Sequence, residues 1–405
     1  MERWYSYDNK VQKNNILPAI IVAIAFSDTL INATSWMFSF IVLAVFVLIA
    51  GTFVFKSSTS LTQTLKYRSA MACIRYAAFP YVAIMLYSSS VILIERLGTS
   101  YFNRMIGSGL SNILVATIVA SIVFLYKIDS VDIICDGIML EYFSSIFIAI
   151  THIGVNGLIE HIMNPLDTYE MYFEKHAIGF SMFAFLLYYV LSDAKKRKIR
   201  IGLLIFMEYL IMKRVAILGF IAAIVVCVVY RRKKFRKFGR WCFLLFVMSI
   251  AYMLFSTNQD FKVFMSDLGI LNRALFVDAM KAYYKFEPSY IGKGYGFVSV
   301  VLPTLNIAGF PSIAALHNDI LKDYIELGFV GFILAYIYFF VYAPLKLYGK
   351  GSHKTQSIVL AILTYVLITL FTDNFFDYSQ TMASLIVTLI AIRMNEEMNL
   401  TNQKS

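Results

Sequence analysis

One histidine in this chain stands where proton chemistry is feasible. His317 ends a polar, loop-like stretch and directly precedes a long apolar run, 318–342. At such a boundary an imidazole is partly hydrated, and its neutral form can take a proton from a hydroxyl group. An N-terminal helix cap or an interfacial histidine would explain the same position. The pattern by itself leaves a general base and a structural histidine open.

Two basic residues occupy a short break between apolar segments. Lys213-Arg214 separates 199–212 from 215–230. As helices at ~1.5 Å per residue these segments are roughly 21 and 24 Å long, shorter than a hydrocarbon core of about 30 Å. The two cations would then lie below the lipid surface, which favours a bound anion. Snorkelling to the surface, or a balancing charge on Glu208, remains open.

A third basic residue, Arg273, lies in the long polar loop 256–316. Around it, 267–286 carries apolar residues at helical spacing and ends before a proline, which predicts an amphipathic helix. Further along, Gly292-Lys-Gly-Tyr-Gly296 lacks the strand and helix of a nucleotide fingerprint and predicts a turn. Spacing alone does not distinguish a ligand-binding Arg273 from a surface arginine.

The carboxylates give weaker signals. Glu326 follows His317 by more than two helical turns and falls on the opposite face, so we expect a packing role. Gly328 and Gly331 would permit close helix approach behind it. The acidic, histidine-containing loop 160–176 has no zinc-ligand spacing, which favours a solvated loop over a divalent-cation site. Asp373-Asn374 could form a polar turn or bind ligand hydroxyls.

The elements that must position these residues are membrane helices. The chain is 59% hydrophobic and 15% charged, more apolar and less charged than soluble globular chains. Apolar runs of about twenty residues recur along it. We therefore predict one all-α polytopic membrane domain over 1–405, with about twelve spans: 16–33, 36–55, 70–94, 106–126, 141–162, 176–191, 199–212, 215–230, 241–255, 318–342, 357–372 and 378–392. Between the fourth and fifth, 127–140 reads as amphipathic or irregular.

Charge distribution predicts the topology. The net charge is +11, but the basic residues gather in short loops between the apolar runs, as the positive-inside rule expects. Nucleic-acid binding is therefore not predicted. Both termini should be cytoplasmic, with the loop 256–316 and His317 outside. The four cysteines form no CxxC pair, so neither a disulfide framework nor a zinc site is predicted.

Taken together, these motifs resemble the O-antigen polymerase and O-antigen ligase superfamily, which includes capsule and exopolysaccharide polymerases. The resemblance covers about 170–390, and its patterns occur in this order: Lys213-Arg214, Asn272-Arg273, Gly292-Lys-Gly-Tyr-Gly296, His317-Asn318, then Glu326-Leu-Gly328 and Gly331. The loop-helix aromatic that often accompanies the arginine is here Phe276 rather than a tryptophan.

The resemblance implies a fold like that of GT-C glycosyltransferases, in the bacterial cytoplasmic membrane with the active site facing the periplasm or exterior. It implies a donor oligosaccharide on undecaprenyl pyrophosphate and inverting transfer without a metal or cofactor. Arg214, Arg273 and Lys213 would bind the pyrophosphate, and His317 would be the general base. Candidate acceptor- or sugar-binding residues are Asn318, Asp319, Tyr295, Asp373 and Asn374, and structural roles fall to Gly292, Gly294, Glu326, Gly328 and Gly331.

The predicted activity is polysaccharide polymerisation. The enzyme would transfer the growing chain from its lipid carrier onto the next lipid-linked repeat unit, alongside a flippase and a chain-length regulator of the same pathway. A ligase that passes finished glycan to another acceptor, such as the lipid A core of lipopolysaccharide, shares the motifs. A flippase or permease for the lipid-linked sugar is a third hypothesis, although the halves of the chain lack the repeats of a typical transporter.

Overall fold

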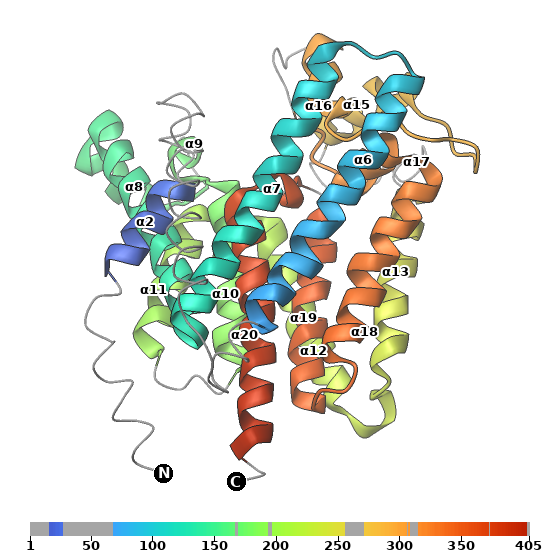
Figure 1. Cartoon of the computed structure of the whole chain (residues 1–405). Helices are drawn as coiled ribbons and strands as arrows, with labels where there is room; N and C mark the ends of the chain where they lie inside the picture. Colours follow the sequence, from blue (N-terminus) through green and yellow to red (C-terminus); the bar gives the residue numbers. More distant parts are fainter. Residues whose placement is uncertain are drawn as a thin grey trace. The chain divides into compact units, whose positions relative to one another are not determined.

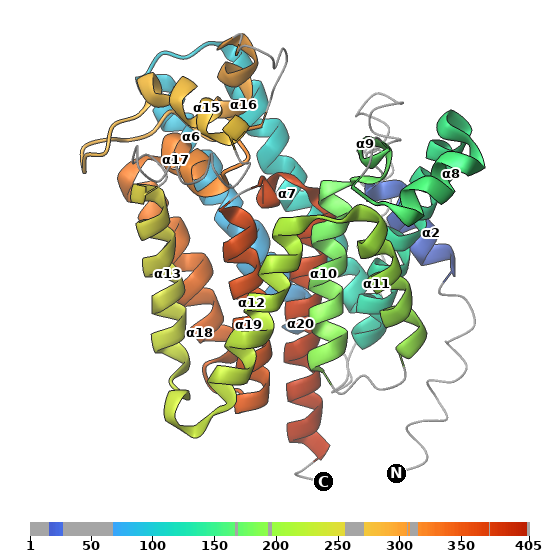
Figure 2. The same ribbon diagram turned by 180° about the vertical axis from the view of Figure 1, so that it is seen from behind.

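The structure, a computed structural model, describes residues 16–26, 68–166, 169–192, 197–255, 271–305, 307, 315–371 and 373–402. All regular structure among these residues is helical and no strand occurs in them, which confirms the predicted all-α class (Figures 1 and 2). Within the described part, six helical stretches are long and apolar enough to cross a membrane: Arg68–Ile94, Thr99–Met163, Arg214–Arg231, Phe238–Phe255, Asp319–Tyr348 and His353–Leu370.

Most predicted spans fall on helices. The described helices that match them are α10 (His176–Leu191), α11 (Lys198–Ile211), α12 (Arg214–Arg231), α13 (Phe238–Phe255), α19 (His353–Leu370) and α20 (Ser379–Asn402). The helix α2 (Ile16–Phe26) covers the start of the first predicted span. Residues 27–55, which hold the rest of the first two, lie outside the described residues. The count of twelve spans and the position of both termini stay predictions.

Residues 127–140 were expected to be amphipathic or irregular, and the irregular alternative is wrong. The helix α7 (Thr99–Tyr126) ends at a short 3-10 turn, Lys127–Asp129, and α8 (Ser130–Met163) follows at once. The polar residues that made the stretch look irregular are paired. Asp136 receives two hydrogen bonds of 2.8 Å from the Arg200 guanidinium, and Asp132 lies 3.0 Å from the Arg197 guanidinium. Opposite charges at the start of α11 therefore pair with these acidic residues within the helix.

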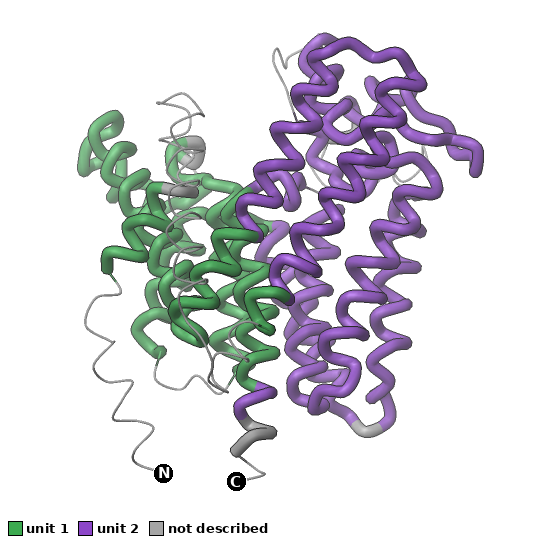
Figure 3. Tube along the Cα trace, viewed as in Figure 1, with its two compact units in different colours: residues 1–71, 117–214, 379–395 green, residues 72–116, 215–378, 396–405 purple. Residues whose placement is uncertain are grey.

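The chain folds into two compact units, each built from separate stretches of sequence (Figure 3). Unit 1 comprises 1–71, 117–214 and 379–395, and unit 2 comprises 72–116, 215–378 and 396–405. In unit 1, α2 packs on α8, where Gly137 leaves room for Val22 and Ala19 of α2. The apolar helix α10 packs against α8 and α11 and is buried along nearly its whole length.

Unit 2 contains the helix that His317 precedes. This helix, α17 (Asp319–Ile337), packs against α6 (Phe79–Ile94), α13 and the short α16 (Phe297–Val301). It is not continuous, because Gly328 has a left-handed φ of 69° and an extended ψ of −175°. Non-Gly residues rarely adopt this conformation. The break leaves backbone groups in the middle of an apolar helix without their helical partners.

The glycine-rich stretch supplies those partners. The amides of Lys293 and Gly294 donate to the carbonyls of Ile325 and Glu326 at 3.0 and 2.8 Å. The amide of Phe329 in turn donates to a loop carbonyl at 2.8 Å. The glycine-rich stretch, which was predicted as a turn, is therefore also bonded through its backbone to the interrupted helix. Backbone groups in apolar surroundings need such bonds, since each unsatisfied one costs several kcal/mol.

The docking demands glycine on both sides. At Gly292, which has φ 88°, an added Cβ would lie 2.5 Å from the Glu326 carbonyl oxygen. At Gly328 it would lie 2.2 Å from the carbonyl carbon of Ile291. Nearby, Tyr290 donates a 2.7 Å hydrogen bond from its hydroxyl to the Ile325 carbonyl. Burial raises the pKa of this phenol, which keeps the hydroxyl protonated and able to donate.

Two prolines widen the helices that contain them. Pro80 follows a π-helical segment, Ile74–Ala78, and Pro344 follows another, Tyr338–Tyr342. A proline ring clashes with the carbonyl four residues earlier and lacks the N–H that would bond to it. A turn with i→i+5 bonding accommodates the ring without breaking the helix. After Pro344 the short helix α18 (Ala343–Tyr348) continues.

The loop before α17 is only partly helical. The predicted helix 267–286 is represented by α15 (Leu271–Ala279) and a 3-10 turn, Lys281–Tyr283. Residues 267–270 lie outside the described residues. The predicted helix therefore ends earlier than its apolar spacing indicated, and α16 and a 3-10 turn, Leu302–Leu305, follow the docked glycine stretch.

The contact between the glycine-rich loop and α17 should contribute to the unfolding free energy. Gly292→Ala places a Cβ against backbone and strains a left-handed residue, so we expect a loss of about 2 kcal/mol or more in unfolding free energy. The matched control is Gly202→Ala in α11, where an added Cβ meets nothing within 4 Å. Thermal unfolding in detergent measures both, and equal midpoints would contradict the docking.

Candidate functional site

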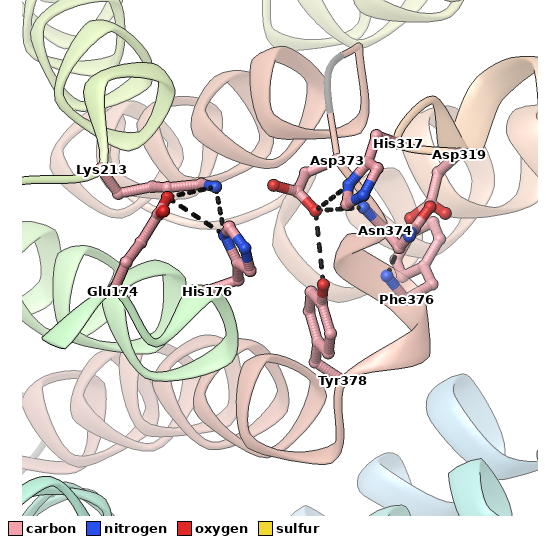
Figure 4. A network of polar contacts seen from close by, with 9 residues as sticks. All are labelled: Glu174, His176, Lys213, His317, Asp319, Asp373, Asn374, Phe376 and Tyr378. Atoms are coloured by element: carbon pink, nitrogen blue, oxygen red, sulfur yellow. Dashed lines mark hydrogen bonds and ion pairs between the residues drawn. The ribbon is translucent and has the colours of Figure 1, made fainter. Parts of the chain in front are cut away.

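A histidine–carboxylate pair stands at the start of α17. The Nδ1 of His317 lies 3.3 Å from Oδ1 of Asp373, which precedes α20 (Figure 4). His317 is about one quarter exposed (28%), whereas the Asp373 side chain is fully buried (0%). A carboxylate oxygen only accepts, so Nδ1 carries the proton and Nε2 of the neutral ring bears the lone pair. The pair therefore orients an imidazole whose Nε2 can accept a proton.

Other groups hold Asp373 in place. The amide of Asn374 donates to Oδ1 at 2.9 Å, and the Tyr378 hydroxyl lies 3.4 Å from the same oxygen. On the histidine side, the Phe276 ring of α15 lies 6.4 Å from the His317 ring. His317 itself has a left-handed φ of 52°, which is uncommon outside glycine. Strained conformations of this kind persist where surrounding contacts over-determine them.

The first residues of α17 connect the two chain segments of the site. The side-chain oxygen of Asn318 accepts from the Leu321 amide at 3.0 Å and caps the helix. Asp319 donates from its amide to the Asp373 carbonyl at 3.3 Å and accepts from the Phe376 amide at 2.9 Å. Asn318 and Asp319 thus position His317 against Asp373. Their predicted contacts with a sugar acceptor stay predictions.

Two buried oxygens near this pair have spare hydrogen-bonding capacity. Oδ1 of Asp319 and Oδ1 of Asn374 accept no hydrogen bond from the described residues. Asp319 is fully buried and Asn374 is 2% exposed. Leaving a buried acceptor unmatched costs about 1–3 kcal/mol. Each could accept a hydrogen bond from water or from a ligand hydroxyl.

A buried ion pair lies behind the start of α17, and the sequence reasoning missed it. Lys322 is 3% exposed, and its Nζ lies 2.5 Å from Oδ1 of Asp377. The same ammonium lies 5.9 Å from the centre of the Tyr295 ring. The Tyr295 hydroxyl accepts from Asn112 at 3.1 Å, so this predicted sugar-contact residue packs inside unit 2. Helical spacing could have indicated Lys322, because it falls one turn after Asn318.

Among the described residues, Glu326 bonds to the loop and not to another long helix. Its Oε1 accepts from the Val298 amide at 3.0 Å, at the first turn of α16. Gly331, one turn further, brings α17 close to Tyr87 of α6, where an added Cβ would lie 3.3 Å from the tyrosine ring. The carboxylate thus helps to hold the docked loop, which adds to the packing role expected for it.

Unit 1 contains a second polar cluster, formed around Lys213. This residue is 5% exposed, and its ammonium donates to Oε1 of Glu174 at 3.0 Å and to Nδ1 of His176 (Figure 4). An ammonium has no acceptor, so the imidazole accepts and is neutral with its proton on Nε2. The hypothesis that Glu208 balances Lys213 is wrong, because Glu174 takes that place. Glu208 is buried, and neither of its carboxylate oxygens has a hydrogen-bond partner among the described residues.

The other predicted phosphate ligands differ in exposure. Arg214 begins α12 and is exposed, and it forms no ion pair with the described residues. Arg273 lies in α15, but its side chain is outside the described set. The interpretation of 160–176 as a solvated loop is wrong for His161, which is fully buried, contacts the Leu210 carbonyl at 2.9 Å and stacks on Phe173. No group of three or more potential metal ligands occurs in the described chain.

Part of the chain matches a known protein family. Residues 199–336 match the family model described as O-Antigen ligase, whose members are membrane glycosyltransferase-like enzymes. The match places this segment in the O-antigen ligase and polymerase superfamily, as the motifs predicted. Lys213, Arg214, Arg273 and His317 all lie inside it, whereas Asp373 lies beyond its end. No curated protein matches the chain significantly.

The two neighbouring cations should respond differently to truncation. Lys213→Ala removes one partner of a largely buried ion pair and should lower the unfolding free energy by about 2–3 kcal/mol. Arg214→Ala alters an exposed side chain and should change it by less than about 0.5 kcal/mol. Thermal unfolding of the purified proteins makes the comparison. Equal destabilisation would show that the Glu174 contact adds nothing to stability.

Proposed function

We propose that this protein is a polysaccharide polymerase of the bacterial cytoplasmic membrane. It would transfer glycan from a polyprenyl pyrophosphate, undecaprenyl pyrophosphate being the expected carrier, onto the next lipid-linked repeat unit. The observation that carries the proposal is the pair formed by His317 and Asp373. It lies at the start of an apolar helix, and His317 belongs to the segment that matches the O-antigen ligase family.

The pair is suited to activating an acceptor hydroxyl. As the hydroxyl oxygen bonds to the anomeric carbon, the bond from that carbon to the pyrophosphate oxygen breaks. The proton passes to Nε2 of His317, and the electron pair of the broken bond leaves with the pyrophosphate. Asp373 stabilises the imidazolium that results, since it holds Nδ1–H. Attack opposite the leaving group inverts the anomeric configuration.

The leaving pyrophosphate is negatively charged, so basic residues would bind it. Arginine binds phosphate oxygens in a bidentate manner, and such charge-assisted bonds are strong. We assign this role to Arg214 and Arg273. Lys213 is a weaker candidate, because its ammonium is already bound by Glu174 and His176. Fixed cations that neutralise the leaving group can act in place of a metal ion.

Two alternatives use the same lipid-linked substrate. An O-antigen ligase would deliver finished glycan to a different acceptor, and the family match supports it as well as a polymerase. A flippase would move the substrate without breaking or forming a covalent bond. The pairing of His317 with Asp373 favours an enzyme over a flippase, because transport needs no general base. In the polymerase proposal, the site faces the periplasm or exterior and works with a flippase and a chain-length regulator.

Substitution of His317 tests the chemistry. His317→Ala in the purified enzyme should slow extension of a lipid-linked repeat unit by about 10²–10⁴-fold, the usual contribution of a general base. The control is His353→Ala, an exposed histidine that also begins a helix. Gel separation of the glycans measures the ladder of products. A normal ladder from His317→Ala would remove this residue from the mechanism. If the wild-type enzyme forms product only with lipid A core as the acceptor, the protein is a ligase.

The arginines should act on the transition state. Arg214→Ala and Arg273→Ala should each lower kcat/KM by about 10²–10³-fold, because charge on the leaving pyrophosphate loses a fixed donor. Arg240→Ala removes an exposed arginine from α13 and serves as the control. Initial rates over a range of donor concentrations give the values. Unchanged kcat/KM in Arg214→Ala would mean that this side chain reaches solvent and does not bind the substrate.

A further inference from the structure

Unit 2 contains an apolar groove that the proposed reaction does not use. The groove has a volume of about 550 Å³ and runs between α6 and α17 with its π-helical continuation. Its walls include Phe79, Ala83 and Tyr87 on one side and Leu334, Ala335 and Tyr338 on the other. Several of these face outward, since Phe79 is 56% and Leu334 is 62% exposed. The groove therefore opens onto the surface that a bilayer would cover.

The sequence explains why these two helices leave a hollow. Ala83, Gly331 and Ala335 are small residues on the facing sides of the helices. Both π-helical segments also line the same end of the groove, through Arg75 and Tyr76 on one wall and residues of Tyr338–Tyr342 on the other. A π-helical turn is wider than an α-helical turn and often marks a functional site.

Tyrosine hydrogen bonds define both ends of the groove. At one end, the Tyr338 hydroxyl donates to the Arg75 carbonyl at 3.3 Å and joins the two walls. At the other end, the Tyr87 hydroxyl donates to the Ile291 carbonyl at 2.7 Å and joins α6 to the docked loop. From Leu327 to Tyr342 the helix rises roughly 22 Å at ~1.5 Å per residue. Half of a hydrocarbon core is about 15 Å, so one acyl chain fits along the groove.

Charge distinguishes the two ends. Arg75 is the single charged residue among the described residues that line the groove, and it is exposed at the end where Tyr338 closes it. An exposed arginine beside an apolar channel can pair with a phosphate while its stem packs on the hydrocarbon. No described charged residue lines the end near Tyr87 and Leu327. A ligand with one apolar chain and one anionic head is thus expected to bind with its head at Arg75.

We propose that this groove binds one acyl chain of an anionic glycerophospholipid, with the lipid phosphate paired to Arg75. The lipid is not the reacting substrate. Along α17, the segment from Asp319 to Tyr338 corresponds to roughly 28 Å at ~1.5 Å per residue, so a head group at Arg75 lies far from His317. The bound lipid would stabilise the packing of α6 on the interrupted helix that His317 precedes.

Native mass spectrometry of the delipidated full-length protein tests the site. Phosphatidylglycerol, phosphatidylcholine and undecaprenyl phosphate are added separately, and bound lipid is counted. Wild type should bind one phosphatidylglycerol more tightly than phosphatidylcholine. Ala335→Trp should weaken the binding of phosphatidylglycerol at least tenfold. Arg75→Gln should abolish the preference for phosphatidylglycerol over phosphatidylcholine. Ala83→Trp, at an exposed position on the opposite wall, repeats the blocking test if Ala335→Trp does not fold.

Matched controls separate the groove from general effects. Ala222→Trp alters a half-buried alanine of α12 outside the groove, and Arg96→Gln removes an equal charge at the opposite end of α6. Both should bind lipid like wild type. Unchanged phosphatidylglycerol binding in the blocked variants would overturn the proposal. So would a loss confined to undecaprenyl phosphate, which would assign the groove to the polyprenyl chain of the substrate. Because binding is measured without turnover, the outcome is independent of the proposed catalytic role of His317.

Discussion

The interruption of α17 at Gly328 is the constraint on which unit 2 depends. An apolar helix that opens its hydrogen-bond ladder must find other partners for the exposed amides and carbonyls. Here the glycine-rich stretch provides them through backbone bonds to Ile325, Glu326 and Phe329. Only glycine at 292 and 328 allows the two backbones to come this close. The extended loop is thereby joined to the helix that His317 precedes.

The start of the same helix gathers charged residues that contact the segment after α19. Lys322 is paired with Asp377, and Asp319 accepts a backbone amide from the same 3-10 turn, Phe375–Asp377. These contacts hold the segment after α19 against the start of α17. Asp373 lies in that segment, so the network also sets where it meets His317. His317 and Asp373 are held in this way without any bound substrate. In the proposed reaction, such preorganisation would reduce the reorganisation needed for proton transfer.

Apolar periodicity was sufficient to predict three long helices of the family segment. The runs 199–212, 215–230 and 241–255 became α11, α12 and α13 with small shifts at their ends. His317 could be identified as a candidate, because it joins a polar loop to an apolar run and belongs to the family-like motifs. Asp373 was a candidate sugar contact, but its pairing with His317 could not be predicted, since the two residues are distant in sequence and Asp373-Asn374 looks like an ordinary polar turn. Pairing between distant segments depends on tertiary packing, which no local pattern encodes.

Other failures have similar causes. The sequence does not show that Arg197 and Arg200, from another segment, neutralise the acidic residues of 127–140. Lys213 looked like an open anion site because Glu174 could not be placed beside it. A Gly in an apolar helix more often permits close helix packing, so the sequence predicts packing at Gly328 and not a break. The loop that bonds to the broken helix comes from a separate segment, and no local pattern predicts that contact.

A double-mutant cycle on kcat/KM measures whether His317 and Asp373 act as one catalytic unit. His317→Ala, Asp373→Asn and the double variant would be compared with wild type on the same lipid-linked repeat unit. Groups that act together are strongly non-additive. We expect Asp373→Asn alone to be slowed at least tenfold and the double variant to be no slower than His317→Ala. Effects that multiply in the double variant would show that the two residues act independently and not as one catalytic unit.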